Sequence, residues 1–504
     1  MRDRLPRILS NTEKLEHALK TKPERFWIKR GEDMALELFH EMSQRVPAYK
    51  DFLKRHLYNP ASVKTIQDFK KILPIDKDNY LRKYPLKDLC WDGELPEKSW
   101  VISATSGSTG EPFYFPRTDI QDEYYALTAE LYLRSNFGID KKTTLYIDAF
   151  AMGAWIGGLF TYEAVKKVAE KGYSLSIITP GINKHEVINE VRRLGPHFDQ
   201  VIIGSYPPIL KDIIDIGIEE GLNWSDYNLG VVFSAEGFSE NFRDYIAKHA
   251  KLANIYTSTL NHYGTVDLGT MSHETPASIM VRRQAVKDKE LFKGMFGAIT
   301  KLPTLTQYLP ELFYFEEAAG KLYCSSYSGL PLVRYDLKDN GGILTLNQVQ
   351  NLYKKSGKNF ITNIKRTGLE NTLWNLPLVY LYERSDFSVT LVGAIIHAEE
   401  IRKALLEKAF HRALTGKFTM EVKTDRKQNS KLIVNLELRR NVSPSSLLSR
   451  QIRIAIVKVL LEENTEYTSN YATYGSKIWP KIIFWPNEHA LHFDGKGKQK
   501  WVKK

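Results

Sequence analysis

The sequence predicts an α/β protein in which a large multi-layer α/β N-terminal domain is joined by a hinge to a small α+β C-terminal domain. At 504 residues the chain is longer than one compact core usually is, so two or more domains are expected. In its middle part, short apolar runs alternate with amphipathic segments, which is typical of strands and helices in layers. From about Val389 a strand and a helix precede β-rich runs, which indicates the α+β domain.

The large domain is expected to span residues 1–385. Its start, about residues 1–100, is predicted to be helical because apolar residues recur at helical spacing from Met34 and again from Phe52. Strands are then predicted for T-T-L-Y-I-D-A-F, Q-V-I-I-G-S, L-G-V-V-F-S-A-E and A-N-I-Y-T-S, and a helix for I-L-K-D-I-I-D-I-G-I-E-E. The pattern assigns no function to residues 341–380.

The small domain is expected to span residues 386–504. A strand that leads into a helix, V-T-L-V-G-A-I-I-H-A-E-E-I-R-K-A-L-L, is predicted at its start. The runs F-T-M-E-V-K-T and K-L-I-V-N-L-E-L, separated by polar residues, are predicted to be strands.

Composition indicates a soluble globular enzyme or binding protein, with 43% hydrophobic and 12% aromatic residues. The two cysteines, Cys90 and Cys324, exclude a four-cysteine zinc site and a disulfide framework, and such scarcity fits a reducing cytosol. The start lacks a signal-peptide pattern, and nothing approaches the roughly 20 apolar residues of a membrane span. We therefore expect a cytoplasmic protein without a membrane span.

The net charge of +12 raises the alternative of a non-enzymatic protein that binds nucleic acid. The sequence has no recognisable nucleic-acid module, however, and its basic residues are spread along the chain except at the tail. We therefore expect no nucleic-acid partner.

Open α/β sheets bind their ligands at the carboxyl ends of the strands. The loops in that position are predicted at residues 150–153, 204–206, 234–237 and 257–267. These loops are the first candidates for a binding site.

A loop rich in hydroxyl groups and glycine, T-S-G-S-T-G, is a further candidate. It matches neither a nucleotide P-loop, nor the nucleophile elbow of hydrolases, nor the dinucleotide-binding glycine pattern. Its backbone N–H groups and hydroxyls suit a polyphosphate, and its glycines allow close approach; a plain surface loop is the alternative.

The loop and further stretches, in the same order, resemble the adenylate-forming superfamily, and most closely its phenylacetate–CoA ligase branch. The resemblance implies that the loop binds the phosphates of ATP through Thr105, Ser106, Gly107, Ser108, Thr109 and Gly110. N-H-Y-G-T-V-D is similar to the motif whose aromatic ring lies by the adenine or acyl group, which implies this role for Tyr263 and Gly264. The acid that ends this motif, Asp267, is implied to help hold Mg²⁺.

Two more stretches imply nucleotide contacts. P-L-V-R-Y-D-L-K-D resembles the stretch whose final aspartate, here Asp339, binds both ribose hydroxyls; Leu337 and Lys338 stand where the family has threonine and glycine. Y-E-R-S-D-F resembles the hinge motif, which implies that Arg384 contacts the nucleotide and that Asp386 is the hinge.

The C-terminal stretches imply the mobile part of the site. G-A-I-I-H-A-E-E-I is similar to the segment that lines the thiol channel, with a plain packing unit as the alternative. D-G-K-G-K resembles the glycine-lysine motif, which implies that Lys496 is the catalytic lysine; Lys498 and Lys500 lie close enough to be alternatives.

The acyl pocket is implied by two other segments. S-A-E-G matches the segment that borders this pocket in the branch, which implies roles for Ala235 and Glu236, although Glu236 is equally suited to be an acid at a helix N-terminus. Phe150 and Gly153 fall where the branch has its pocket wall, with Tyr263 as a further lining residue.

Together these motifs imply an ATP- and Mg²⁺-dependent ligase that forms an acyl-adenylate, releases pyrophosphate, and passes the acyl group to a thiol, most simply coenzyme A. Transfer to an amine or a carrier protein, and a degenerate relative that only binds its ligands, are the alternatives. The branch resemblance alone favours an aromatic carboxylic acid as substrate.

Overall fold

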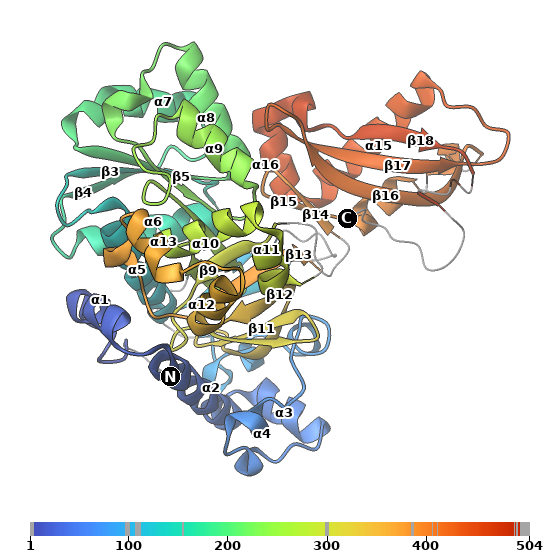
Figure 1. Cartoon of the computed structure of the whole chain (residues 1–504). Helices are drawn as coiled ribbons and strands as arrows, with labels where there is room; N and C mark the ends of the chain where they lie inside the picture. Colours follow the sequence, from blue (N-terminus) through green and yellow to red (C-terminus); the bar gives the residue numbers. More distant parts are fainter. Residues whose placement is uncertain are drawn as a thin grey trace. The chain divides into compact units, whose positions relative to one another are not determined.

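The computed structural model describes residues 5–95, 101–105, 112–153, 156–297, 302–384, 388–405, 407–410, 412–487, 489 and 492–493, and all structural statements concern these residues. The chain forms two compact units (Figure 1). The larger comprises Met1–Ser103, Phe115–Ser205 and Leu210–Glu383, and the smaller comprises Ala104–Tyr114, Tyr206–Ile209 and Arg384–Lys504.

The larger unit begins with helices. Pro47 is the first residue of the third helix, where the missing N–H of proline costs nothing. The helices of this part of the chain are α1 (Thr12–Thr21), α2 (Glu24–Arg45), α3 (Pro47–Arg55), α4 (Ile66–Phe69), α5 (Asp119–Tyr132), α6 (Ile156–Ala169), α7 (Lys184–Leu194), α8 (Pro207–Glu219), α9 (Glu240–His249), α10 (Pro276–Lys287), α11 (Lys289–Phe296), α12 (Leu346–Lys355) and α13 (Phe360–Arg366).

One large sheet forms the centre of the larger unit, and among the described residues it has eleven strands in the order β10-β11-β12-β13-β9-β8-β7-β6-β5-β3-β4. The strands of this part are β1 (Val101–Ala104), β2 (Tyr114–Arg117), β3 (Thr144–Ala149), β4 (Leu175–Ile178), β5 (Gln200–Ser205), β6 (Gly230–Phe233), β7 (Thr259–Thr265), β8 (Gly269–His273), β9 (Thr304–Gln307), β10 (Tyr314–Ala318), β11 (Lys321–Ser326), β12 (Leu332–Leu344) and β13 (Leu378–Arg384). Strands β1 and β2 pair separately.

The half of the sheet from β4 to β7 is parallel. Its inner strands β3, β5 and β6 are buried along their whole length, which explains why apolar residues predominate in their sequences. Helices α5 and α6 pack together and cover one face of this half. On that face Tyr146, Ile202, Val232 and Leu260 form a hydrophobic core with both helices. Burial of each such side chain contributes roughly 1.5–3 kcal/mol.

The predicted strand A-N-I-Y-T-S is wrong. These residues form turns, and strand β7 begins after them at Thr259. The side chain of Asn254 accepts a hydrogen bond from the backbone N–H of Tyr256 (2.9 Å), and the Asn254 carbonyl accepts one from the N–H of Ser258 (2.7 Å). These local hydrogen bonds of Asn254 stabilise a turn, so the segment does not form a strand.

Residues 341–380 form the end of β12, helices α12 and α13, and the start of β13. Val349, Tyr353 and Phe360 belong to one hydrophobic core cluster that also includes residues of α10 and α11. The segment therefore extends the core of the larger unit.

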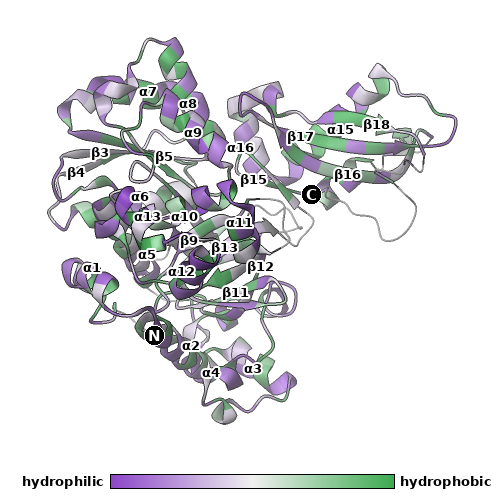
Figure 2. Cartoon of the chain, viewed as in Figure 1, coloured by the Kyte–Doolittle hydropathy of each residue, from purple (hydrophilic) through white to green (hydrophobic). Residues whose placement is uncertain are grey.

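The smaller unit contains a three-stranded sheet of order β16-β17-β18 and a hairpin of β14 and β15. Hydrophobic stretches run through β17 and α15 (Figure 2), and these residues are largely buried. Its elements are β14 (Ser388–Leu391), β15 (Ala394–His397), α14 (Ala398–Leu405), β16 (Leu414–Thr424), β17 (Ser430–Leu438), α15 (Ser446–Glu463), α16 (Thr465–Tyr474) and β18 (Lys481–Trp485).

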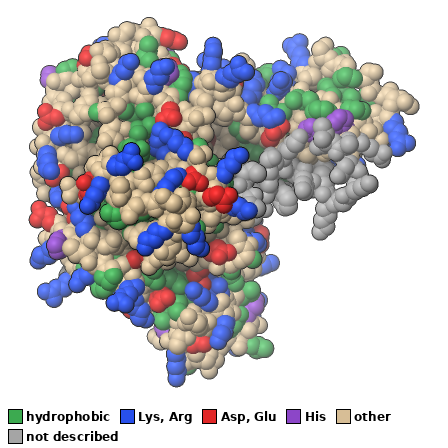
Figure 3. Space-filling model, viewed as in Figure 1, with side chains coloured by type: hydrophobic (Ala, Val, Ile, Leu, Met, Phe, Trp, Pro, Cys, Tyr) green, Lys and Arg blue, Asp and Glu red, His purple; other side chains and the backbone are tan. Residues whose placement is uncertain are grey.

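The structure confirms the predicted α/β fold class, with a large layered sheet unit and a smaller α+β unit. In the described part of the chain, no helix is both long and apolar enough to cross a membrane. On the visible face, Lys and Arg side chains are spread out among Asp and Glu side chains (Figure 3).

Candidate active site

Two residues that the sequence assigned to nucleotide binding lie in direct contact. The hydroxyl of Tyr263 on β7 donates a hydrogen bond to Oδ2 of Asp339 on β12, at 2.7 Å. Tyr263 is 5% exposed and Asp339 is 6% exposed. The hydrogen bond fixes the direction of the Asp339 carboxylate, because hydrogen bonds to charged groups are stronger than those between neutral groups.

The residue before Asp339 adopts a backbone conformation that favours glycine. Lys338 has a φ angle of 59°, in the left-handed region, which costs a non-glycine residue on the order of 1–3 kcal/mol. Its ammonium group forms ion pairs with Asp76 (2.6 Å) and Asp336 (3.1 Å), and these offset the strain. Two carboxylates thus hold Lys338 in a conformation that favours glycine.

Asp267 lies in the turn between β7 and β8 and is 8% exposed. Its Oδ2 accepts a hydrogen bond from the Tyr335 hydroxyl at 2.7 Å, and its Oδ1 lies 3.4 Å from the ammonium group of Lys77. The turn is tight at Gly264, where a Cβ atom would lie 2.7 Å from the carbonyl oxygen of Gly269. Both carboxylate oxygens of Asp267 therefore have partners within the protein.

The residues around Asp267 do not form a metal site by themselves. No cluster of three or more His, Cys, Asp or Glu side chains able to hold a metal ion occurs among the described residues. Mg²⁺ is commonly bound through one or two carboxylates together with substrate phosphates. Asp267 fits such a site only as one ligand beside the phosphates of a nucleotide.

The loop of residues 234–237 follows strand β6. Ala235 has a φ angle of 71°, which is unusual for a residue with a Cβ atom. The carbonyl oxygen of Glu236 accepts a hydrogen bond from Nδ2 of Asn261 on β7, at 3.1 Å. Helix α9 starts at Glu240, with Ser239 as its N-cap, so Glu240 is the first-turn acid. The alternative that Glu236 is an acid at a helix N-terminus is therefore wrong.

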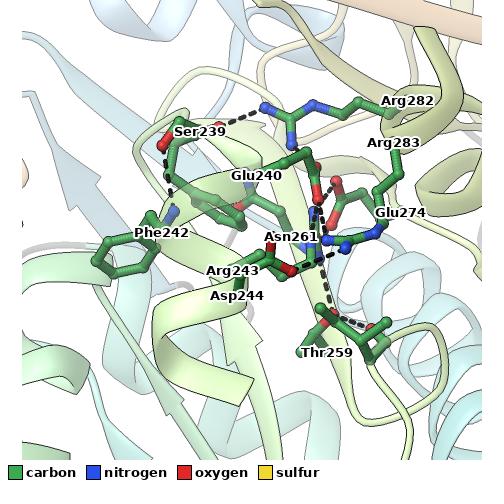
Figure 4. Close-up of polar contacts among 12 residues, drawn as sticks. Ser239, Glu240, Phe242, Arg243, Asp244, Thr259, Asn261, Glu274, Arg282 and Arg283 are labelled. Atoms are coloured by element: carbon green, nitrogen blue, oxygen red, sulfur yellow. Dashed lines mark hydrogen bonds and ion pairs between the residues drawn. The ribbon is translucent and has the colours of Figure 1, made fainter. Parts of the chain in front are cut away.

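A buried ionic network lies behind this loop (Figure 4). The guanidinium group of Arg243 donates to Glu274 Oε1 at 2.6 Å and to Thr259 Oγ1 at 2.7 Å. The other oxygen of Glu274 accepts a hydrogen bond from the backbone N–H of Asn261 at 2.9 Å. Arg243 and Glu274 are 0% and 1% exposed. The network therefore fixes the strand position from which Asn261 reaches the carbonyl of Glu236.

A second arginine ties the network to the loop itself. Arg282 on α10 forms an ion pair with Glu240 and donates to the carbonyl oxygen of Phe238 (Figure 4). Although burial acts to raise it, the pKa of Glu240 is lowered by Arg243, Arg282 and Arg283. Glu240 is thus an anion held by three cations, and helix α9 is anchored at its first turn.

The candidate acyl-pocket residues before α6 differ in exposure. The Phe150 side chain is 1% exposed, and its backbone N–H donates to Oδ1 of Asp148 at 3.2 Å. Gly153 is exposed and has a φ angle of 103°, which glycine adopts without strain.

The hydroxyl and glycine loop is described only at its first residue. The backbone N–H of Thr105 donates to the carbonyl of Phe113 at 3.0 Å, and its Oγ1 accepts from the Phe113 N–H at 2.9 Å. Thr105 therefore closes the base of the loop. For Arg384 only the backbone, at the end of β13, is described. The remaining candidates, Ser106, Gly107, Ser108, Thr109, Gly110, Asp386 and Lys496, lie outside the described residues.

The sequence did not single out several residues of this region. Lys77, the partner of Asp267, lies in a segment without a recognisable pattern. Arg243 and Glu274 are 31 residues apart and belong to no motif. Tyr335 belongs to the stretch P-L-V-R-Y-D-L-K-D, but the motif does not indicate a contact with Asp267. Only the hydrogen bond between the two side chains shows that they lie together.

Comparison with solved structures identifies the fold. The chain matches 2-hydroxyisobutyryl-CoA ligase, in complex with 2-HIB-AMP and CoA in the thioesterification state, with a TM-score of 0.65 and 13% sequence identity over 99% of this chain and 94% of that chain. The chain has the fold of this ligase. The same ligase in the postadenylation state, in complex with 2-HIB-AMP, matches with a TM-score of 0.53 and 13% identity over 97% of this chain and 90% of that chain. No protein-family model matches the chain, and no curated protein matches its sequence.

Proposed function

We propose that this chain is an AMP-forming ligase that activates a carboxylic acid with ATP and transfers the acyl group to a thiol, with coenzyme A as the acceptor. The fold supports this proposal, because the ligase with the same fold is bound to an acyl-adenylate, 2-HIB-AMP, and to CoA. We further propose the phenylacetate–CoA ligase-like branch, an aromatic acid and a cytoplasmic location.

The observation that carries the proposal is the contact between Tyr263 and Asp339. The two residues come from separate motifs, 76 positions apart, and the resemblance implies a place beside the adenine or acyl group for Tyr263 and beside the ribose for Asp339. A carboxylate suits a vicinal diol because its two oxygens can accept both hydrogen bonds. An aromatic ring beside that carboxylate suits stacking on a base.

The first step needs cations, because it brings an anion onto a polyanion. An oxygen of the substrate carboxylate attacks the α-phosphorus of ATP, and the bond to the β-phosphate oxygen breaks to release pyrophosphate. We propose that Lys496 stabilises the negative charge that develops between the substrate carboxylate and the α-phosphate. Thr105 and residues 106–110 would bind the departing phosphates. Asp267 is the proposed protein ligand of the Mg²⁺ that accompanies ATP.

The second step requires a different arrangement around the acyl group. The acceptor thiolate attacks the acyl carbon, and AMP leaves with the electron pair of the C–O bond. We propose that residues 386–504 move about Asp386 between the steps, so that Lys496 leaves and the acceptor enters. Arg384 would contact the nucleotide, and Phe150, Gly153, Ala235 and Glu236 would border the acyl pocket.

The test is pyrophosphate release from Mg-ATP with a panel of aromatic and aliphatic carboxylic acids, with and without coenzyme A. Acid-dependent release is expected in the wild type and a loss of at least about a hundredfold in Lys496→Ala, as is usual for groups that stabilise transition-state charge. Lys498→Ala and Lys500→Ala are matched controls that should retain activity.

Each outcome separates the alternatives. Release that depends on the acid, followed by disappearance of a free thiol, supports the thioester ligase. An amine or a carrier protein is supported as the acceptor if pyrophosphate release is unchanged without coenzyme A and an acyl product forms only when one of these acceptors is added. ATP binding without pyrophosphate release from any acid would contradict the ligase and indicate a degenerate relative.

A further inference from the structure

A surface cavity of about 320 Å³ lies on the larger unit, at the amino ends of two parallel strands. Its walls are α1, the π-helical turn Leu133–Phe137 with the loop that continues to Lys142, and the 3₁₀ turn Glu370–Thr372 with Trp374. Lys142 lies two residues before β3, and its ammonium group donates to Oε1 of Gln200, the first residue of β5, at 3.3 Å. A cavity of this volume is large enough for a small-molecule ligand.

This cavity is separate from the candidate active site. The loops at residues 150–153 and 204–206 follow the carboxyl ends of β3 and β5, where open parallel sheets bind their ligands. The cavity lies at the opposite ends of the same strands, and the six residues of β3 span about 20 Å. A ligand in the cavity would therefore leave the proposed places of ATP and the acyl group free.

Contacts between distant parts of the chain hold the walls of the cavity together. Arg134 on the π-helical turn forms two hydrogen bonds with the carboxylate of Glu16 on α1, at 2.9 and 3.1 Å. The side chain of Asn375 donates to the carbonyl oxygen of Lys20 at the end of α1, at 2.9 Å. The cavity is thus formed without a ligand, and the charges of Arg134 and Glu16 offset each other.

The other charges of the walls favour an anion. Lys20, Lys141 and Lys142 line the cavity, and Asp140 is the remaining acid among the residues that line it. None of these three lysines forms an ion pair with another residue that the structure describes. Three lysines and one aspartate leave an excess of two positive charges. This excess matches a phosphate group, which carries about −1.5 to −2 at neutral pH, better than a singly charged carboxylate.

Two buried N–H groups of the wall residues also have no acceptor among the described residues. They are Nε1 of Trp374, which is 1% exposed, and Nδ2 of Asn136, which is 8% exposed. The Asn136 oxygen accepts a hydrogen bond from the Ser135 hydroxyl at 2.9 Å, so its amide donors are what remains unpaired. An indole nitrogen can only donate. Buried donors without acceptors are rare, and both residues line the same cavity, which indicates that a ligand supplies the acceptor atoms.

We propose that this cavity binds a phosphate group, either as free phosphate or on a small organic molecule. The three lysines supply the charge, and Asn136 and Trp374 supply N–H donors for the phosphate oxygens. The site does not depend on the proposed ligase activity, and it gives the larger unit a second ligand besides those of the active site.

The test is a calorimetric titration of the full chain with inorganic phosphate, glycerol 3-phosphate and acetate at constant ionic strength. The wild type is expected to bind both phosphate compounds more tightly than acetate, because they carry more charge and more acceptor oxygens. Tighter binding of glycerol 3-phosphate would identify a phosphorylated organic ligand, and equal binding of the two would identify the phosphate group alone as the ligand.

Single substitutions locate the bound phosphate. Lys20→Gln and Lys141→Gln each remove one charge at an exposed position, and each should raise the dissociation constant for phosphate by about fivefold or more. Trp374→Phe keeps an aromatic ring without the N–H donor and should also weaken phosphate binding. The matched control is Lys64→Gln, because Lys64 is an exposed lysine that does not line the cavity.

Equal phosphate affinity of the wild type and Lys141→Gln would overturn the proposal, since the phosphate would then bind elsewhere, for example at residues 105–110. Absence of phosphate binding by the wild type, or acetate binding as tight as phosphate binding, would overturn it too. Without phosphate, both lysine variants should unfold at the temperature of the wild type. A lower unfolding temperature would count against the proposal, because these lysines would then serve the fold.

Discussion

The hydroxyl of Tyr263 donates a hydrogen bond to the carboxylate of Asp339 across 2.7 Å, between strands β7 and β12. This contact joins a ring suited to a base with a carboxylate suited to a ribose. Because both side chains are buried, they are oriented before any nucleotide arrives. Preorganisation of this kind lowers the entropy cost of binding.

Asp339→Asn should weaken ATP binding. The variant keeps the shape of the side chain but loses the charge that accepts the ribose hydrogen bonds. Hydrogen bonds to charged groups contribute about 1.5–3 kcal/mol, so the dissociation constant for ATP should rise about ten- to a hundredfold. Titration calorimetry measures this dissociation constant. Tyr263→Phe, which keeps the ring, should lose less ATP affinity than Asp339→Asn. Unchanged ATP affinity in both variants would contradict the nucleoside assignment.

Arg243→Met should destabilise the fold strongly. The change leaves the buried carboxylate of Glu274 without its ionic partner, and breaking one member of a buried pair costs about 3–5 kcal/mol. Urea denaturation measures the free energy of unfolding of each variant. Arg283→Met is the matched control, because the Arg283 side chain is 14% exposed and one of its two partners, Asp244, is 52% exposed. Equal losses in the two variants would refute the central role of Arg243.

Lys77→Met should increase the affinity of the nucleotide-free protein for Mg²⁺. Lys77 lies 3.4 Å from Asp267 and competes with any cation there. Removal of the positive charge should strengthen Mg²⁺ binding by at least about tenfold, because a monovalent and a divalent cation about 4 Å apart repel each other by about 2 kcal/mol even at the dielectric constant of water. Mg²⁺ titration followed by calorimetry tests this, with the exposed Lys83→Met as control. Identical affinities in wild type and Lys77→Met would speak against Asp267 as a metal ligand.

Stability should depend on pH through Glu400 in the smaller unit. Burial, with smaller contributions from Glu463 and Glu466, raises the pKa of Glu400 to about 7, despite hydrogen bonds from the His397 backbone and Asn464. The folded state thus keeps a proton that the unfolded chain loses above about its ordinary value of 4.5. The stabilisation is fully present below that pH and is lost as the pH rises through about 7.

Glu400→Gln should remove this pH dependence. The wild type is expected to lose up to roughly 3 kcal/mol between pH 4.5 and 8 from this group, whereas the variant keeps a neutral side chain throughout. Unfolding measured as a function of pH tests the difference. Glu462→Gln, at an exposed position of α15, should behave like the wild type. A pH profile of Glu400→Gln that matches the wild type would contradict the assignment.

The fold could be predicted because buried parallel strands have a simple sequence pattern. Strands β3 and β5 are buried along their whole length and are rich in apolar residues, because both faces of the sheet are covered, and the predicted runs coincide with them. Tyr263 and Asp339 could be named because each lies in a contiguous motif. Their hydrogen bond could not, since it depends on how β7 and β12 are placed in the sheet.

Contacts between distant residues account for most of what the sequence left open. The pairing of Arg243 with Glu274, and of Lys77 with Asp267, follows from tertiary packing and leaves no local pattern. The false strand before Thr259 arose because apolar and β-branched residues also occur in an Asn-directed turn.

Lys338 gives the site a sensitivity to ionic strength. The backbone next to Asp339 keeps its left-handed conformation through the ion pairs of Lys338 with Asp76 and Asp336, and the Lys338 side chain is 33% exposed. Dissolved salt weakens such partly exposed pairs, whereas a glycine would need no such support. We therefore expect ATP binding at the proposed Asp339 site to weaken as salt is added, and Lys338→Gly to remove this salt dependence.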